Sequence, residues 1–111
     1  MCKSMFRYVC AVFLMIAPAL LFISPAQAQD PASLYKSKCA VCHSADGSGS
    51  SPAGKAMKVP DLRSEAVQKQ SDAQLTDTVT NGKKQMPAYK DKVSADEIKG
   101  LVGYMRGLAK K

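Results

Sequence analysis

The segment "SKCAVCHSADG", Ser37 to Gly47, decides how this chain folds, because it gathers the side chains most able to hold a metal or a cofactor. Cys39 and Cys42 stand three positions apart, and His43 follows the second cysteine directly. It is the only histidine of the 111 residues. This spacing suits a metal clip, a redox disulfide or a cofactor tether, and the rest of the sequence has to discriminate among them.

The chain opens with the order of parts found in a secretory signal peptide. A basic start and an apolar run over residues 9–23 precede Ala26-Gln27-Ala28, which has the small residues of a cleavage site. We expect cleavage after Ala28, which leaves a leader at 1–28 and one domain at 29–111. The apolar run is shorter than the about 20 residues that cross a bilayer as a helix. An uncleaved anchor is therefore the alternative.

The expected mature domain is small and basic. Its 83 residues can form only a small hydrophobic core, and chains of this size usually need a disulfide, a bound metal or another stabilising group. It keeps 14 basic residues against 9 acidic ones, a formal charge of +5. This excess predicts an acidic partner surface. Aromatic residues do not alternate with basic ones as in nucleic-acid binding, so we expect no nucleic acid as partner.

The mature chain reads as helices joined by long loops. Asp30-Pro31 is a good helix start and predicts a helix that continues to His43. Residues 44–56 are rich in Ser, Gly and Pro and predict a loop. Ser71 and Gln74 form a capping-box pattern for a second helix over 72–80, which Asn81-Gly82 ends.

The last helix carries the clearest amphipathic pattern. Ser94 and Glu97 form a second capping box. Behind it an apolar stripe recurs at steps of three and four residues: Ile98, Leu101, Val102, Met105 and Leu108. Gly100, Gly103 and Gly107 cost this helix about 1 kcal/mol each relative to alanine, which indicates a closely packed neighbour. No strand pattern appears, so we predict an all-α domain.

The cysteine cluster fits zinc and disulfide chemistry poorly. A structural zinc needs four Cys or His ligands, and after leader removal only Cys39, Cys42 and His43 remain. A thioredoxin-like redox disulfide needs a βαβ setting that the sequence lacks. A plain structural disulfide is a further alternative. Cys-x-x-Cys-His is instead specific for covalent attachment of a c-type haem, with His43 as proximal iron ligand. One haem would also supply the missing core.

A six-coordinate haem iron needs a second axial ligand, and no other histidine exists. Met57, Met86 and Met105 are the candidates. Met105 belongs to the apolar stripe and is interpreted as core. We favour Met86 over Met57, because a long excursion from His43 lets the chain pass around the ring and approach its opposite face.

The mature chain resembles a small bacterial class I cytochrome c over about residues 34–108. The resemblance rests on "LYKSKCAVCH", "VPDL", "GKKQMPAY" and "EIKGLVGYMRGL". It implies the class I cytochrome c fold, in which the first and last helices cross and Tyr35 meets Leu101 and Tyr104. It also implies that Pro60 and Leu62 line the haem pocket, and that a loop carbonyl such as that of Pro52 orients His43. At the crossing, the small residue usual in the family would fall at Pro31 or Ala32.

We therefore predict a soluble, periplasmic, monomeric one-electron carrier and not an enzyme, in a respiratory or photosynthetic chain. Methionine as second ligand raises the reduction potential. We expect redox partners with acidic docking surfaces, contacted around Lys55, Lys58, Lys83 and Lys84, and at most transient contact with membrane complexes. The alternatives are a haem c gas sensor or peroxidase-like enzyme with a labile distal ligand, and a basic haem subunit of a membrane oxidase.

Overall fold

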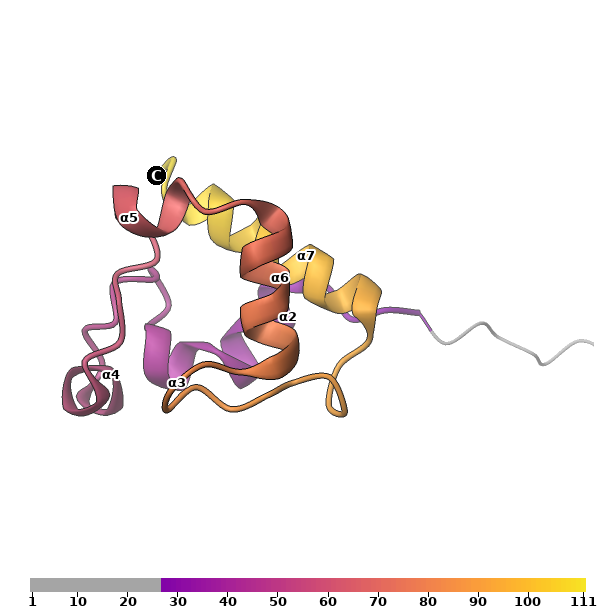
Figure 1. Ribbon diagram of the computed structural model, residues 1–111, viewed down its shortest axis with the longest axis horizontal. Helices are drawn as coiled ribbons and strands as arrows, with labels where there is room; N and C mark the ends of the chain where they lie inside the picture. Colours follow the sequence, from indigo (N-terminus) through magenta and orange to yellow (C-terminus); the bar gives the residue numbers. More distant parts are fainter. Residues whose placement is uncertain (1–26) are drawn as a thin grey trace, which may run out of the picture.

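The computed structural model describes residues 27–111, which form helices and loops (Figure 1). The predictions for the leader before residue 27 lie outside the described residues. Between residues 27 and 111 there is no strand, only an isolated antiparallel pair between Lys83 and Met86. None of the helices in this range has the length and apolarity of a membrane span. The helices are α2 (Pro31–Lys38), α3 (Ala40–His43), α4 (Pro52–Met57), α5 (Glu65–Gln68), α6 (Asp72–Asn81) and α7 (Ala95–Leu108).

The first predicted helix is divided at Cys39. Asp30 caps α2 as expected, accepting a hydrogen bond from the Ser33 amide at 3.1 Å, with proline at the first helical position. Cys39 has φ −112° and ψ −38°, outside the usual helical range for φ. Its amide still bonds the Tyr35 carbonyl at 2.9 Å, and the His43 amide bonds the Cys39 carbonyl at 2.9 Å. Backbone hydrogen bonds at Cys39 thus connect the end of α2 to the start of α3, although the helix is interrupted there.

Two short helices occupy segments where the sequence analysis placed none. The prediction of a loop throughout 44–56 was wrong, because α4 begins at Pro52. The Ser51 side chain caps it by accepting from the Gly54 amide at 3.0 Å. Ser64 caps α5 in the same way through the Val67 amide. A serine side chain satisfies an amide that the first helical turn leaves unbonded, so one turn can form in an otherwise loop-like composition.

The two predicted capping boxes are confirmed. In α6 the Ser71 side chain accepts from the Gln74 amide and the Gln74 side chain accepts from the Ser71 amide. Ser94 and Glu97 make the same reciprocal pair at the start of α7. The α6 helix runs one residue past its predicted end, to Asn81, and stops at Gly82.

Helix α7 is the central element and packs against both α2 and α6 (Figure 1). Its five predicted apolar residues are all buried. One core cluster lies between α2 and α7, and a second joins α7 to α5 and α6. The first contains Leu34, Tyr35, Val93, Ile98, Leu101 and Leu108, and the second Val67, Leu75, Val102 and Met105. The predicted crossing of the first and last helices is confirmed, and the rings of Tyr35 and Tyr104 lie 5.1 Å apart between centroids.

The glycines of α7 play different roles. A Cβ atom at Gly100 would lie 2.9 Å from Cγ of Pro31, so this glycine permits the close approach of α2. A Cβ at Gly103 or Gly107 would meet nothing within 4 Å in the described structure. The expectation of a close neighbour is confirmed for Gly100 and wrong for the other two. The small residue at the crossing thus stands on α7, opposite Pro31.

Arg106 fastens the opposite end of α7 to the turn between α5 and α6. Its guanidinium donates to the Gln68 carbonyl at 2.7 Å, to the Gln70 carbonyl at 2.6 Å and to Asp72 Oδ1 at 2.7 Å. These bonds hold α5 and α6 beside α7. The candidate functional site lies between these three helices and the segment from α2 to α4.

Candidate functional site

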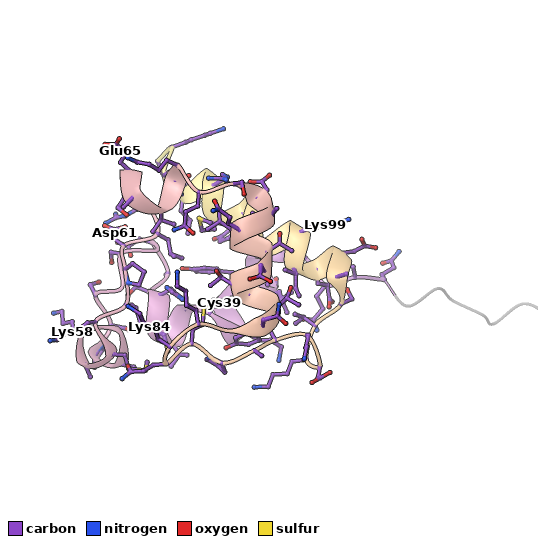
Figure 2. All side chains as sticks on the ribbon, viewed as in Figure 1. Cys39, Lys58, Asp61, Glu65, Lys84 and Lys99 are labelled. Carbon is purple, nitrogen blue, oxygen red and sulfur yellow. The ribbon has the colours of Figure 1, made fainter. Side chains whose placement is uncertain are left out.

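A cavity of about 620 Å³ opens where the two core clusters meet. This volume falls in the range of about 300–1,000 Å³ typical of cofactor sites. Every site residue predicted from the sequence lines it: Cys39, Cys42, His43, Met86, Pro60 and Leu62. Met57, Met105 and much of both apolar clusters complete the wall. In Figure 2 Cys39 lies within the ring of helices that surrounds this space.

The two cysteines enter the cavity from the start and the body of α3. Both are free thiols, so they do not form the structural disulfide considered above. Burial raises the pKa of Cys39. Between residues 27 and 111, no group of three or more His, Cys, Asp and Glu side chains is arranged to hold a metal ion. The described structure therefore gives no support to the zinc alternative.

His43, the last residue of α3, has a buried imidazole nitrogen. Its Nδ1 atom makes no hydrogen bond within the described structure, and burial lowers the pKa of the ring. The expected bond to the Pro52 carbonyl is absent. Pro52 is the first residue of α4 rather than a loop residue, and a carbonyl at that position is directed along the helix toward the amide four residues on.

The cavity fits a haem group. It offers two unpaired thiols, a neutral imidazole, thioether sulfurs and a wall of mainly apolar side chains. A buried imidazole nitrogen without a partner is costly in a finished core. The lowered pKa favours the neutral imidazole, in which one ring nitrogen has a free lone pair that can bind iron.

Helix α4 buttresses the segment that carries Cys42 and His43. The Ser51 hydroxyl donates to the carbonyls of Val41 and Cys42, at 2.9 and 3.1 Å. A Cβ atom at Gly54 would overlap the Cys42 carbonyl oxygen, so only glycine allows this approach. Neither supporting residue was predicted from the sequence. The Ser51-Pro52 pair, a helix cap followed by proline at the first position, was the available signal.

Met86 is presented by a tight turn. The amide of Met86 bonds the carbonyl of Lys83 at 3.0 Å, and the amide of Lys83 bonds the Met86 carbonyl at 3.1 Å. Gly82, at φ +77°, makes room for this turn, because a Cβ there would lie 2.6 Å from the Met86 carbonyl oxygen. Pro87 restricts the backbone on the other side. These contacts hold the Met86 backbone in one conformation in the described structure.

The other two methionines of the cavity belong to helices. Met57 is the last residue of α4. Met105 is buried on α7, and its sulfur receives a hydrogen bond from Gln68 Nε2 at 3.2 Å. The same nitrogen donates to the Leu62 carbonyl at 2.7 Å. Met105 is therefore engaged as part of the wall, as the apolar stripe predicted.

Basic side chains gather at the cavity. Lys58, Lys83 and Lys84 line it as the sequence analysis expected of a basic rim, together with Lys38, which that analysis did not name. Lys55 does not line it. Figure 2 shows Lys58 and Lys84 toward α4, whereas Lys99 lies on the side of α7. Val41, between the two cysteines in the sequence, is the one large apolar side chain of the described residues that is exposed, at 65%.

Sequence comparisons relate the chain to haem proteins. Residues 26–105 match the family described as cytochrome c oxidase, cbb3-type, subunit III. Cytochrome c6 of Nostoc sp. is 36% identical over 91 residues, which cover 79% of each chain. Cytochrome c6 of Synechocystis sp. is 30% identical over an alignment 119 positions long, gaps included, which covers 97% of each chain.

A solved structure shares the architecture. The c-type cytochrome KustC0563 superposes with a TM-score of 0.67 at 28% sequence identity. The match covers 72% of this chain and 98% of that one. The similarity thus extends over essentially the whole of that protein.

Proposed function

Because this chain belongs to the class I c-type cytochromes, we propose that Cys39 and Cys42 hold its haem by thioether bonds and that His43 and Met86 are the axial iron ligands. The observation that carries the assignment is one cavity lined by both thiols, the imidazole and Met86, with Met86 held there by its bonded turn to Lys83. The family has a covalently bound haem c and transfers single electrons, and this chain is such an electron carrier.

The residues around the cavity have distinct tasks in this function. When bound, the haem iron supplies the one-electron step between Fe(II) and Fe(III). The protein holds both ligand segments rigidly, through Ser51 and Gly54 on the His43 side and through the Lys83 to Met86 turn on the other. A thioether ligand raises the reduction potential relative to a second histidine. The apolar wall of the cavity excludes water, so little solvent has to reorganise when the charge of the iron changes.

The relatives favour a carrier over the alternative of an oxidase subunit. The matched family is named for a subunit of cbb3-type oxidase, but cytochrome c6 of Synechocystis sp. aligns over 97% of both chains. A gas sensor or peroxidase-like enzyme would need an open or easily vacated sixth position. The bonded turn around Met86 argues against an easily vacated one.

The docking partner proposed for this carrier is a redox protein with an acidic surface. The rim of Lys38, Lys58, Lys83 and Lys84 surrounds the cavity that takes the haem, and the exposed Val41 offers an apolar contact beside it. We place the protein in the periplasm as a monomer, with the leader removed after Ala28. In support, the alignment with cytochrome c6 of Synechocystis sp. spans nearly the full length of both chains, leader region included.

The test is the absorption spectrum of the purified holoprotein, oxidised and reduced, with carbon monoxide added to the reduced form. We expect low-spin haem with both vinyl groups converted to thioethers, seen in the alkaline pyridine haemochrome, and no rapid binding of carbon monoxide. Normal haem yield and a low-spin spectrum in the Cys39→Ser, Cys42→Ser double variant would refute the attachment. Fast carbon monoxide binding would favour the sensor or enzyme instead.

A further inference from the structure

The starts of α2 and α7 are joined through one carboxylate. The backbone nitrogen of Gln29 donates to Oε1 of Glu97 at 3.1 Å. Gln29 directly precedes Asp30, the cap of α2, and Glu97 lies in the first turn of α7. The other oxygen of Glu97, Oε2, accepts from the Ser94 amide at 2.8 Å. A single side chain thus caps α7 and holds the segment that enters α2.

Removal of the leader changes the chemistry of this donor. In the uncut chain the Gln29 nitrogen belongs to a neutral peptide bond with Ala28. After cleavage between these residues the same nitrogen is an amino group that carries a positive charge at neutral pH. We propose that processing creates an ion pair between the Gln29 ammonium group and the Glu97 carboxylate, which fastens the mature amino terminus to α7. This inference rests on the cleavage site proposed above.

Electrostatics explains why a carboxylate is needed at this place. The positive ends of two helix dipoles meet here, and a cation beside a helix N-terminus is unfavourable. Hydrogen bonds from Ser94 and then from Gln29 lower the pKa of Glu97, and the charge of Lys38 contributes. Glu97 is therefore ionised at neutral pH. Asp30 and Asp96 are the other acidic groups at these helix starts, and the Asp30 side chain is already bonded to Ser33.

The ion pair predicts a particular pH dependence. A carboxylate partner raises the pKa of the amino group in the folded protein above its unfolded value of about 7.7–8.0. The stabilisation is fully present below the unfolded value and is lost as the pH rises through the folded one.

An amino-terminal glutamine also has a competing fate. Its neutral amine can attack the carboxamide carbon of its own side chain, forming a lactam C–N bond and releasing ammonia. The lactam nitrogen carries no charge and forms no ion pair. Because a protonated amine is not a nucleophile, Glu97 is expected to slow this cyclisation.

The experiment compares holoproteins that begin at Gln29 with holoproteins that retain Ala28. Glu97→Gln is made in both, and Asp96→Asn serves as the control that removes a neighbouring carboxylate. Glutamine also supports a capping box, so the start of α7 is retained in the Glu97→Gln variant. The readouts are the pKa of the α-amine, from the pH dependence of its acylation, and the melting temperature below and above the amine pKa.

In the form that begins at Gln29 we expect acylation at neutral pH to be about threefold slower than in its Glu97→Gln variant, the size typical of an exposed ion pair. Asp96→Asn should acylate like the unmodified protein. The loss of melting temperature in Glu97→Gln should be larger at neutral pH than at high pH, and smaller when Ala28 is retained.

Three results would overturn the proposal: equal acylation rates with and without Glu97, a lactam at the terminus of freshly purified protein, or a native terminus other than Gln29. Haem spectrum and reduction potential are recorded for every variant. They remain unchanged if only the ion pair is wrong, whereas failure of the proposed haem ligation would appear in the unmodified protein.

Discussion

Met86 differs from Met57 in how firmly the backbone holds it. Two hydrogen bonds to Lys83 close the turn before Met86, whereas Met57 ends α4 next to Lys58 at φ +53°. Both sulfurs belong to residues that line the same cavity, so location alone does not choose between them. A backbone held in a closed turn loses less conformational freedom when its side chain binds iron, and on this ground we favour Met86.

The choice can be tested by replacing each methionine with leucine, which is similar in volume and cannot bind iron. Met86→Leu should abolish the weak charge-transfer band at the red end of the oxidised spectrum. It should also lower the reduction potential by tenths of a volt, since axial ligands tune haem potentials over about 0.8 V. Met57→Leu is the matched control and should leave both properties nearly unchanged. The reverse pattern would assign the ligand to Met57.

Among single residues, those with a recognisable chemical motif could be predicted from the sequence. Those whose role comes from a tertiary contact could not. The Cys39, Cys42 and His43 motif indicates covalent haem attachment whatever the fold, so these residues could be proposed from the sequence, and the structure brings all three to one cavity. Ser51 acts only because α4 lies against the carbonyl end of α3. Such a tertiary contact has no local pattern in the sequence, and even the cap signal at Ser51 reveals the helix but not its neighbour.

Among the helices, α7 contains two glycines that can be compared directly. Gly103→Ala should stabilise the holoprotein by about 0.5–1 kcal/mol, because alanine is the better helix former and the new methyl group meets nothing. Gly100→Ala should destabilise it by about 1 kcal/mol, since the methyl group would press on the ring of Pro31 and overpacking outweighs the propensity gain. Urea unfolding of both variants measures the difference. If both variants were equally stabilised, α2 would have to move away from the new methyl group at position 100 at no cost in free energy.

The helices show where sequence patterns carry enough information. The capping boxes and the apolar stripe of α7 are local, repeated signals, and they located α6 and α7 almost to the residue. The α4 and α5 helices span a turn or little more, too short to display a hydrophobic period. The interruption of the first helix at Cys39 could not be predicted either, because no residue around Cys39 is a helix breaker.

At the scale of the whole molecule, the basic rim should govern the encounter with a partner. Electron transfer to an acidic partner should slow several-fold or more between about 0.01 and 0.1 M salt, as the screening length falls from about 30 to 10 Å. Lys83→Glu with Lys84→Glu should remove much of this dependence. Lys99→Glu with Lys110→Glu, two exposed changes on α7 and just past its end, makes the same change in net charge and is the control. The charge-transfer band is checked in each variant, and equal effects at both places would leave the rim without a specific role.

We expect the whole fold to depend on the haem that fills its cavity, because the core is small. Two small core clusters face each other across a space of about 620 Å³, and Leu62 packs against both. The sequence indicated this arrangement in outline, since 83 residues without a staple form a marginal core. It gave no indication of the Arg106 contacts that close one end, because those acceptors are backbone carbonyls far away in the chain.

The placement of His43 has a consequence for how the carrier responds to acid. Histidine is the side chain whose ordinary pKa lies between pH 5 and 8, and this chain has only one, set against the cavity. The outer surface therefore has no imidazole to gain a proton as the surroundings acidify. Histidine protonation then adds no charge to the carrier's surface over this range of acidity, and we expect dissolved salt to be the main external control of its attraction toward an acidic partner.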